Sequence, residues 1–471
     1  MANVLLLRPG PDKLASRRKF VPDLGIGYLS STLKAHEHRV CFVDLNAPGL
    51  GPDALANVLR SECFDLVGIK AFSNETPHVV DCLQTVKSLS PQSVSILGGP
   101  HPSGMGVRVL EQFPQLDLAQ VSEAESGLPM LAALVAEHGR DALERADDLA
   151  SIPGLVYRSD NGAQANERAL VEDLDSLGLP DFEAMNLRWF VKHPACFFGQ
   201  YIPLMTGRGC PMPCTYCAAR LISGRQRRVH GLDYLLEYLR RVRDDYGASS
   251  FSLIDDHFLA ESQFALAFCN RLVDEQIGLR WQCASNGVRA EMLSEELVRA
   301  MERSGCRFIS VGIESGAPRV LELMKRRVDV QTLYEKIAMV RRVSSIRVCG
   351  FHVLGFPGET EQEREQTLRG SLRSRLDYAD FLIFQPFPGS VIGDRMLGSM
   401  ALETLANIDY DRPTTAMDPQ TALQVKRFQR KAYLRFYLRP RVLFGALVRG
   451  PSLRIMFKNL LSVFMPSRGG R

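Results

Sequence analysis

The sequence lacks the features that mark membrane-spanning and secreted proteins. It contains no apolar run of eighteen or more residues, so no helix long enough to span a bilayer is predicted. The opening residues, Met1–Gly10, contain neither a basic segment nor a long apolar one, and we expect no secretory signal peptide there. Eleven cysteines in a chain of this length do not make a secreted disulfide scaffold. These absences predict a protein of the reducing cytoplasm.

The chain also lacks a strong charge of one sign. Its 57 Lys and Arg residues and 53 Asp and Glu residues leave a net charge of +4, which is too small to predict binding to nucleic acid. Hydrophobic residues at 45% and charged residues at 23% are ordinary for a globular protein. Because 471 residues exceed what one hydrophobic core usually holds, we expect two or three domains.

Residues 1–145 alternate short apolar runs with helical patterns. Four runs have the length of buried parallel strands, namely Val4–Leu7, Val40–Val43, Leu66–Ile69 and Val94–Leu97. This repetition predicts a doubly wound, Rossmann-like α/β domain that binds its ligand at the carboxyl ends of the strands. Polar or glycine-rich segments follow the strands there, at Asp44, Phe72–Glu75, Gly98–Pro102 and, after a fifth strand, Ser122–Glu125. Glycines at such an edge let the backbone approach a large flat ligand.

Residues 146–195 read as a connector between two domains. The segment is rich in aspartate, and Asn161-Gly162 between two strand-like runs predicts a small hairpin. His193 and Cys196 near its end are cavity-lining candidates, although an isolated Cys is more often inert packing.

Three cysteines lie on one short loop, in the run Thr206-Gly-Arg-Gly-Cys-Pro-Met-Pro-Cys-Thr-Tyr-Cys217. Cys thiolates are the usual ligands of iron–sulfur clusters. Three thiolates, from Cys210, Cys214 and Cys217, leave one iron of a four-iron cluster open. Gly207 and Gly209 permit the tight turns that such a loop needs. A three-Cys zinc site and three unrelated thiols are the alternative interpretations.

A second β-α rhythm runs from Tyr201 to about residue 395. Strand-like runs at 201–206, 250–254, 280–284, 308–311 and 348–354 alternate with helical segments, and we count Val348–Leu354 as a sixth strand. Polar clusters follow the strands at Asp255–Phe258, Ser285–Arg289, Gly312–Gly316 and Gly355–Thr360. Barrel enzymes place their chemistry on this face. Thr360 and Glu363 predict a helix capping box.

The Cys-x-x-x-Cys-x-x-Cys run, with Tyr216 before the last Cys, resembles the signature of the radical S-adenosylmethionine (SAM) enzymes. The ordered polar clusters resemble the partial (β/α)6 barrel of that family, here over residues 196–395. The resemblance implies a 4Fe–4S cluster on the three cysteines, with SAM chelated to the open iron through its amino and carboxylate groups.

The groups that SAM presents indicate which side chains bind it. Its ammonium requires an acceptor such as Asp255 or Asp256, since an acidic motif follows this strand in the family. The methionine carboxylate of SAM requires hydrogen-bond donors or a cation. The two ribose hydroxyls of SAM suit a protein carboxylate, which can accept a hydrogen bond from each. We expect these further contacts from Ser285, Asn286 and Arg289 (carboxylate), Glu314 (ribose) and Tyr216 (adenine). One of the two aspartates can instead cap a helix, and Arg228 and Arg289 are equally well explained as surface ion pairs.

The N-terminal domain resembles the cobalamin-binding domain that precedes the barrel in one large radical SAM subfamily. The resemblance rests on Pro22–Leu29, Val43-Asp44, Gly98–His101 and Glu123–Glu125. It implies cobalamin as a cofactor, with Asp44, Ser73, Gly98, Gly99 and Glu123 as candidate contacts. The Asp-x-His-x-x-Gly motif of other cobalamin proteins is absent, and His101 stands in the wrong context to replace its axial His. The alternative is a degenerate nucleotide-type domain used for docking.

The C-terminal extension, residues 396–471, is basic and predicted to be helical. From Pro419 onward it carries twelve Lys and Arg residues and no Asp or Glu, with apolar residues between them. Such helices can lie on anionic membranes, bind an acidic substrate or cap the floor of the barrel. The Phe436–Pro440 run resembles helices that cap the barrel in related enzymes. For residues 441–471, peripheral membrane contact and plain packing are equally supported, and a membrane-associated cytoplasmic location stays open.

The combined resemblance implies a cobalamin-dependent radical SAM enzyme. We expect a C-methyltransferase acting on an unactivated carbon of a small-molecule biosynthetic intermediate, with a flavodoxin or ferredoxin as electron donor. A cobalamin-dependent oxidative cyclase or ring-rearranging enzyme without methyl transfer is the alternative, and a non-catalytic sensing module is a third. Methylthio transfer is not favoured, because the sequence has no second Cys triad. The sequence identifies neither the substrate nor a catalytic side chain.

Overall fold

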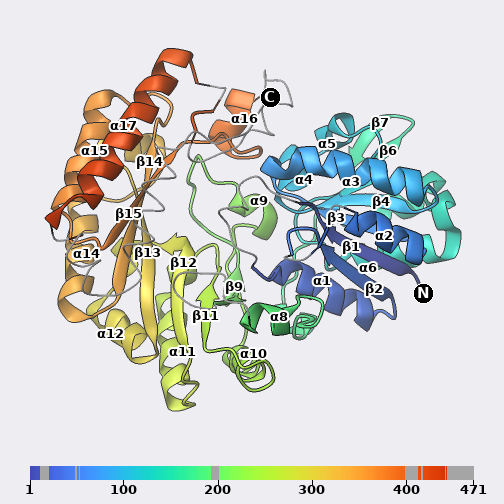
Figure 1. Cartoon of the computed structure of the whole chain (residues 1–471), viewed down its shortest axis with the longest axis horizontal. Helices are drawn as coiled ribbons and strands as arrows, with labels where there is room; N and C mark the ends of the chain where they lie inside the picture. Colours follow the sequence, from blue (N-terminus) through green and yellow to red (C-terminus); the bar gives the residue numbers. More distant parts are fainter. Residues whose placement is uncertain are drawn as a thin grey trace.

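The computed structural model describes residues 1–10, 21–47, 50–51, 53–192, 201–397, 412–414, 417–440 and 442. Within β12, the side chains of Ser285 and Asn286 lie outside this description. The chain forms two α/β parts that lie side by side, with α1, α8 and α9 at their junction (Figure 1). His193 and Cys196 fall outside the described residues, and the division of the chain at residues 145, 195 and 395 stays a prediction.

A seven-stranded sheet forms the N-terminal part, in the order β2-β1-β3-β4-β5-β6-β7. Its first five strands are parallel: β1 (Asn3–Arg8), β2 (Arg39–Asp44), β3 (Leu66–Lys70), β4 (Val94–Gly98) and β5 (Leu118–Gln120). Helices cover both faces, which confirms the doubly wound prediction. One face carries α2 (Ala54–Ser61), α3 (Thr76–Leu89) and α5 (Arg108–Gln112); the other carries α1 (Leu24–Ala35), α6 (Gly127–His138) and α7 (Ala146–Ser151). A short helix, α4 (Pro100–Met105), follows β4.

The predicted hairpin is present and belongs to this sheet. It consists of β6 (Leu155–Ser159) and β7 (Gly162–Ala165), which pair antiparallel. Because β6 also pairs antiparallel with β5, the N-terminal sheet continues to Ala165, beyond the predicted boundary at residue 145.

The second part is an open barrel of six parallel strands in the order β15-β14-β13-β12-β11-β8. The strands are β8 (Ile202–Leu204), β11 (Ser250–Leu253), β12 (Arg280–Val288), β13 (Cys306–Glu314), β14 (Arg347–Leu354) and β15 (Tyr378–Ile383). The six-unit barrel is confirmed, but one detail of the prediction is wrong. The strand at Val348–Leu354 is the fifth, and β15 is the sixth.

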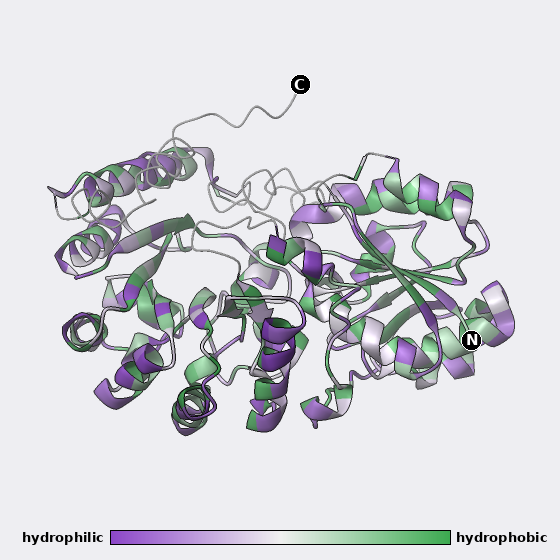
Figure 2. Ribbon diagram, turned by 60° about the horizontal axis from the view of Figure 1, so that its bottom comes forward, coloured by the Kyte–Doolittle hydropathy of each residue, from purple (hydrophilic) through white to green (hydrophobic). Residues whose placement is uncertain are grey.

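Amphipathic helices surround the barrel strands. They are α10 (Leu232–Asp244), α11 (Ser262–Asp274), α12 (Glu295–Arg303), α13 (Pro318–Leu323), α14 (Val330–Val343) and α15 (Glu361–Arg373). Figure 2 shows hydrophobic residues mainly along the strands and hydrophilic residues on the outer faces of the helices. The predicted capping box of Thr360 and Glu363 opens α15.

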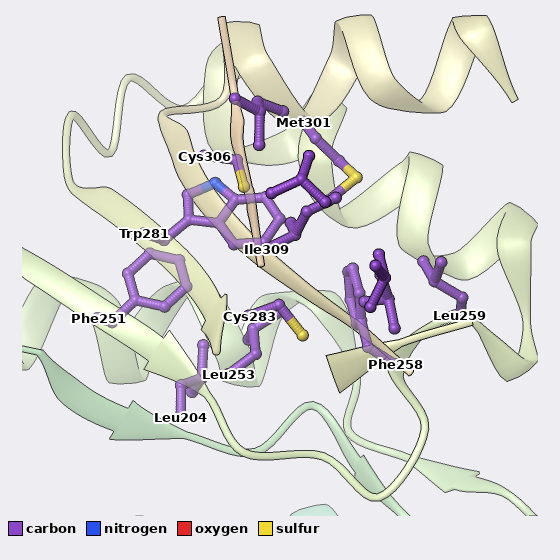
Figure 3. Packing of buried hydrophobic residues seen from close by; sticks show 14 of the residues in the cluster. Leu204, Phe251, Leu253, Phe258, Leu259, Trp281, Cys283, Met301, Cys306 and Ile309 are labelled. Atoms are coloured by element: carbon purple, nitrogen blue, oxygen red, sulfur yellow. The ribbon is translucent and has the colours of Figure 1, made fainter. Parts of the chain in front are cut away.

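The barrel core is built around Trp281 of β12, which is fully buried (Figure 3). Its indole stacks on Phe251 at 6.0 Å between ring centroids, and its Nε1–H donates to the Ser304 carbonyl at 3.1 Å. A buried indole therefore has both an apolar contact and a partner for its polar atom. This packing holds the neighbouring strand ends in fixed positions.

The helix α17 (Pro419–Tyr437) packs on the edge strand β15, as Figure 1 also shows. The Tyr437 hydroxyl donates to the Ala379 carbonyl at 3.0 Å, and Gln429 donates to the Phe381 carbonyl at 2.8 Å. The predicted capping by the first half of the extension is confirmed. Most of the segment for which membrane contact was considered, residues 441 and 443–471, lies outside the described residues. No described helix is long and apolar enough to cross a membrane.

The two parts share a hydrophobic core. Leu24 and Tyr28 of α1 pack with barrel residues, and so does Phe190 of α8 (Leu187–Lys192). The Tyr28 hydroxyl lies 2.9 Å from the Tyr234 hydroxyl of α10. Helix α1 therefore covers its own sheet on one side and the barrel on the other.

Candidate functional site

The three-Cys loop lies between β9 (Gly207–Arg208) and α9 (Ala219–Ser223). The strand β9 pairs antiparallel with β10 (Arg228–Val229), and the close pairing excludes side chains at two positions. A Cβ on Gly207 would lie 2.3 Å from the Arg228 carbonyl oxygen, and one on Gly209, where φ is +95°, would lie 2.0 Å from that of Gln226. The predicted turn at Gly209 is confirmed by its positive φ, whereas Gly207 lies in β9 and lacks a side chain because of the close pairing with β10.

Cys210, Cys214 and Cys217 are free and half-buried. Burial raises the pKa of all three thiols, and that of Cys217 to about 12. The Ala219 N–H donates to the Cys217 Sγ at 3.5 Å, so backbone dipoles already point at sulfur. No three His, Cys, Asp or Glu side chains of the described residues form a group that could hold one metal ion. In an iron–sulfur cluster each cysteine sulfur binds a different iron, and three thiolates suit that donor set.

The two aspartates after β11 have different surroundings. Asp255 is buried and accepts the Thr206 N–H at 2.8 Å and Arg227 Nη2 at 2.5 Å, and it also bonds the Thr206 hydroxyl. It thereby ties β11 to the start of the Cys loop. Asp256 accepts bonds from Ser223 and from the Gly209 N–H, and its charge raises the pKa of the Cys210 thiol. Of the two, Asp256 lies beside the loop cysteines.

Glu314 ends β13 in a strained conformation, with φ at +63° in a non-glycine residue. Such strain is found at functional sites. Burial raises the pKa of its carboxyl, although Arg326 and a hydrogen bond from Tyr216 oppose the rise. The same Tyr216 bonds the Cys214 thiol. The structure thus brings Glu314, Tyr216 and the Cys loop together.

Arg289 and two residues that the sequence did not indicate form one charge cluster. Arg289 donates to Glu291 at 2.7 Å, and Arg326 donates to the same carboxylate oxygen at 2.8 Å. Arg326 is 2% exposed and also donates to the Gly312 carbonyl. The second oxygen of Glu291 is buried without a protein partner. Arg289 is therefore in an ion pair, but a partly buried one inside the barrel mouth. Charged residues in polar segments give no sequence signal of such burial.

Further buried polar atoms inside the barrel and at its mouth lack protein partners. They are Arg227 Nε and Nη1, His257 Nε2 and Gln282 Oε1. Burial, followed by the charges of Arg289 and Arg227, lowers the pKa of His257 to about 4, so the imidazole is neutral. Buried polar groups are normally hydrogen-bonded, and orphaned ones call for a ligand or water. The mouth therefore suits a ligand with several charged and hydroxyl groups, as SAM has.

The edge of the N-terminal sheet is different in character. A Cβ built on Gly98 meets nothing within 4 Å, and Gly99 has φ at +97° with its backbone packed against Ala71. Asp44 is buried and bonds the Asn46 N–H at 2.8 Å and Arg8 at 3.4 Å. The open backbone at the end of β4 leaves room for a flat ligand, which fits cobalamin.

His101 does not offer a free ring nitrogen to a cofactor. It is fully buried, with Nδ1 3.0 Å from the Ser73 hydroxyl and Nε2 2.7 Å from Gln112 Oε1. Burial lowers its pKa to about 4. Ser73 thus supports the His101 ring.

Glu123 and Arg228, which the sequence indicated separately, form a buried pair between the two parts. Arg228 donates through both terminal nitrogens to Glu123, at 2.9 and 2.7 Å. The predicted surface ion pair of Arg228 is therefore a buried one. Glu123 belongs to the junction, with its carboxylate occupied by protein donors.

Three further polar side chains that follow or lie in the strands, those of Lys70, His352 and Gln385, have protein partners. Lys70 pairs with Asp23 at 2.6 Å, and Gln385 donates to the Arg412 carbonyl at 2.8 Å. His352 is fully buried, stacks on Phe381 and lies 3.2 Å from the Asp380 carbonyl.

Two family models match this chain. The model of the radical SAM superfamily matches residues 204–369, and that of the B12 binding domain matches residues 12–132. The fold and the Cys loop thus define a radical SAM enzyme. With its second domain, the chain belongs to the cobalamin-binding radical SAM enzymes, and its cofactors are a 4Fe–4S cluster, SAM and cobalamin.

Three curated relatives cover most of the chain. An uncharacterized methyltransferase of Pyrococcus horikoshii is 28% identical over 90% of this chain and 89% of its own length. The cytidylyl-2-hydroxyethylphosphonate methyltransferase of Streptomyces wedmorensis is 24% identical over 78% of this chain and 76% of its own. The anaerobic magnesium-protoporphyrin IX monomethyl ester cyclase of Rubrivivax gelatinosus is 21% identical over 95% and 79%.

A solved structure has the same fold. The radical S-adenosylmethionine methyltransferase TsrM from Kitasatospora setae, with cobalamin and a 4Fe–4S cluster bound, superposes with a TM-score of 0.69 and 17% identity. The match covers 85% of this chain and 79% of that protein.

Proposed function

We propose that this enzyme is a C-methyltransferase that acts on an unactivated carbon of a small-molecule biosynthetic intermediate. The observation that carries the proposal is the contact between its two ligand edges. The Ser122 hydroxyl, just after β5 of the N-terminal sheet, donates to the Ile222 carbonyl of α9 at 2.6 Å. This contact supports the proposal that a cofactor bound at the N-terminal edge lies beside the Cys loop. Two of the relatives described above are methyltransferases.

When bound, the cluster and SAM supply a carbon-centred radical that abstracts hydrogen, and cobalamin supplies the methyl group. Cys210, Cys214 and Cys217 hold three irons. Asp256 would accept from the SAM ammonium, because it lies beside the loop cysteines, whereas Asp255 is bonded to Thr206 and Arg227. Glu314 accepts from the ribose hydroxyls, and Tyr216 lies against the adenine.

The SAM carboxylate requires donors at the barrel mouth. Arg289 is suited to this role through its position at the end of β12, with Ser285 and Asn286 on the same strand. Arg326 and Glu291 orient the Arg289 guanidinium by sharing one carboxylate. His257 Nε2, which has no protein partner, is left to meet SAM or the substrate.

On the N-terminal edge, Gly98 and Gly99 provide the backbone surface for cobalamin. Asp44 accepts a hydrogen bond from Arg8, and Ser73 bonds His101, and both contacts fix the backbone at that edge. A reductant must supply electrons to the cluster, and a flavodoxin or ferredoxin is suited to this.

An oxidative cyclisation without methyl transfer is the second candidate. It is favoured by the relative of Rubrivivax gelatinosus, which spans nearly the whole chain.

Anaerobic reconstitution with iron, sulfide and hydroxocobalamin, followed by desalting, tests the proposal. We expect about four irons and about one cobalamin per chain. With SAM labelled in its methyl group and a chemical reductant, we then expect label on the protein-bound cobalamin and release of S-adenosylhomocysteine. Both cofactors bound without any label transfer would favour the cyclase. Iron without cobalamin would contradict both candidates.

A further inference from the structure

The loop Ser122–Glu125 joins the N-terminal sheet to the Cys loop. It leaves β5 at the edge where Gly98 ends the neighbouring strand, and Ser122 adopts a positive φ of 66°. The Ser122 N–H donates to the Ser103 hydroxyl at 2.9 Å, on the side of the N-terminal sheet. Its own hydroxyl bonds Ile222 of α9, on the side of the barrel. One residue thus bonds both parts of the molecule.

Two carboxylates of this loop pair with two buried arginines. Glu123 accepts from both Nη atoms of Arg228, and Arg208 Nη1 lies 3.4 Å from it. Glu125 accepts from Arg208 Nη2 at 2.6 Å. All four side chains are no more than 7% exposed. Charge-assisted bonds in such a dry environment are strong and fixed in geometry.

The two arginines belong to the strands that hold the Cys loop. Arg208 and Arg228 are directly paired in the β9–β10 ladder, and Arg208 precedes Cys210 by two residues. Arg228 also donates to the Ser223 carbonyl at 2.8 Å, at the far end of the loop that carries the cysteines. Glu123 and Glu125 therefore pair with arginines that contact both ends of the Cys loop.

Apolar side chains in place of Glu123 and Glu125 would leave the guanidinium charges of Arg208 and Arg228 buried without a counter-charge. Each arginine has its Nε buried without a protein partner, so the two carboxylates are the main compensation for the guanidinium charges. Removing Glu123 leaves the Arg228 charge buried without its paired carboxylate, and removing Glu125 leaves Arg208, two residues before Cys210, with only the longer contact to Glu123. The arginine left without its carboxylate would then seek another acceptor or water, and the Cys loop would move with it.

We propose that Glu123 and Glu125 are positioning residues that couple the cobalamin site to the cluster site. Glu123 does not contact cobalamin; it transmits the position of the N-terminal edge to the Cys loop, so that each cofactor is bound best when the other is in place. This inference rests on the proposed function, because it requires both cofactors in one chain. Coupling between two sites is reciprocal and can be measured from either one.

A thermodynamic cycle on the full chain tests the coupling. The equilibrium Kd for hydroxocobalamin is measured anaerobically for four proteins: wild type and Glu123→Gln, each with the native cluster and with Cys214→Ala, which prevents cluster assembly. With native Glu123, we expect Cys214→Ala, which lacks the cluster, to bind cobalamin about five-fold or more weakly than the wild type. In the Glu123→Gln background we expect the two Kd values to agree within about two-fold.

Further variants separate coupling from a folding defect. Glu125→Gln, which loosens only Arg208, is expected to reduce the cluster dependence of Kd partially. Glu275→Gln removes an exposed ion pair with Arg240 and is expected to leave the dependence unchanged. The electron paramagnetic resonance spectrum of the reduced cluster with SAM should change for Glu123→Gln and not for Glu275→Gln.

Two results would overturn the coupling. One is a cobalamin Kd in the native Glu123 background that ignores the cluster, and the other is an equal cluster dependence in Glu123→Gln. Absence of cobalamin binding in the wild-type protein would instead overturn the proposed function itself. If Glu123→Gln does not fold, the Glu125→Gln cycle decides by the same criterion.

Discussion

The N-terminal sheet and the barrel both alternate strands with helices and both have a proposed ligand site at the carboxyl ends of their strands. The two edges differ in how many of their buried polar groups have hydrogen-bond partners in the protein. At the N-terminal edge, Asp23 is matched by Lys70, and His101 by Ser73 and Gln112. At the barrel edge, buried atoms of Arg227, His257, Glu291 and Glu359 have no protein partner, whereas at the end of β5 in the N-terminal sheet one such atom is Gln120 Oε1.

This difference reflects the ligands that each edge accepts. A small, highly charged ligand such as SAM supplies bonds to atoms that the protein leaves unpaired. A large, flat ligand such as cobalamin is received by backbone shape, and the charges beneath it are best neutralised in advance.

The largest effect is expected at the barrel edge from Cys214→Ala. Loss of one of three thiolates should abolish cluster assembly and SAM cleavage, while cobalamin still binds. Iron and sulfide analysis of the reconstituted protein measures it. Cys82→Ala, at a buried Cys of α3 in the N-terminal domain, is the matched control and should keep its iron. A Cys214→Ala protein that cleaves SAM would refute the cluster assignment.

The converse change at the N-terminal edge is Gly98→Leu. Its side chain would enter the open space above β4, so we expect cobalamin affinity to fall by about a hundred-fold, equivalent to roughly 3 kcal/mol, with iron content unchanged. Spectroscopic titration with hydroxocobalamin gives the affinity. Ala165→Leu adds the same side chain at an exposed position of β7 and should bind normally. Unchanged binding by Gly98→Leu would move the cobalamin site elsewhere.

The adjacent aspartates sharpen the contrast between paired and unpaired groups. Asp255→Asn should destabilise the protein by about 3–5 kcal/mol, because it leaves Arg227 buried without its carboxylate. Asp256→Asn should change stability much less and weaken SAM binding instead. Denaturant unfolding of the apoprotein and SAM titration of the reconstituted protein separate the two effects. Equal losses of stability would show that both are structural.

Two carboxyl groups, Glu359 at the barrel edge and Asp23 at the N-terminal edge, should contribute to the pH dependence of stability with opposite sign. Burial raises the pKa of Glu359, at the end of β14, to about 7, so its contribution favours the folded state at low pH and is lost as pH rises from the unfolded value toward 7. This loss amounts to roughly 2 kcal/mol between about pH 5 and about pH 7. Glu359→Gln should remove it, as measured by denaturant unfolding at both pH values.

Asp23 at the N-terminal edge provides the opposite sign. Burial raises the pKa of Asp23, but Lys70, Arg8 and the Ile26 N–H together lower it below its usual value. This group therefore stabilises the fold above its unfolded pKa and less as pH falls through the folded one. Asp23→Asn should therefore cost stability at neutral pH and progressively less in acid. A Glu359→Gln protein with the wild-type pH profile would contradict the assignment of Glu359.

The smallest effect is expected from Glu314→Gln. An uncharged amide still accepts a hydrogen bond but loses the charge-assisted part, so the Kd for SAM should rise by about ten-fold, or roughly 1.4 kcal/mol. Glu322→Gln, on the exposed side of α13, is the control. No change in SAM affinity would assign Glu314 to a structural role.

The predictable part of the fold is the part that follows from local sequence. Apolar runs with intervening helical patterns gave both sheets, and three cysteines within eight residues gave the loop. The sixth strand, β15, was missed because Asp380 interrupts its apolar run. Its backbone is nevertheless covered by Tyr433, Tyr437 and Gln429 of α17, a contact between segments far apart in the chain.

The less predictable part of the site arises from tertiary contacts. Arg326 and Glu291 are charged residues in polar segments, and only closure of the barrel buries them beside Arg289. The pairing of Glu123 with Arg228 joins residues 105 positions apart. Local sequence determined that Glu123 lies at a strand end, but only domain docking determined what it contacts.

The burial of α1 between the sheet and the barrel bears on how the chain is made. Domains generally fold as units during synthesis, the N-terminal one first. Here the N-terminal sheet leaves the ribosome with Leu24 and Tyr28 still facing water, and they stay uncovered until α10 follows. We expect the nascent N-terminal part to depend on chaperones in that interval and the finished protein to melt in one transition.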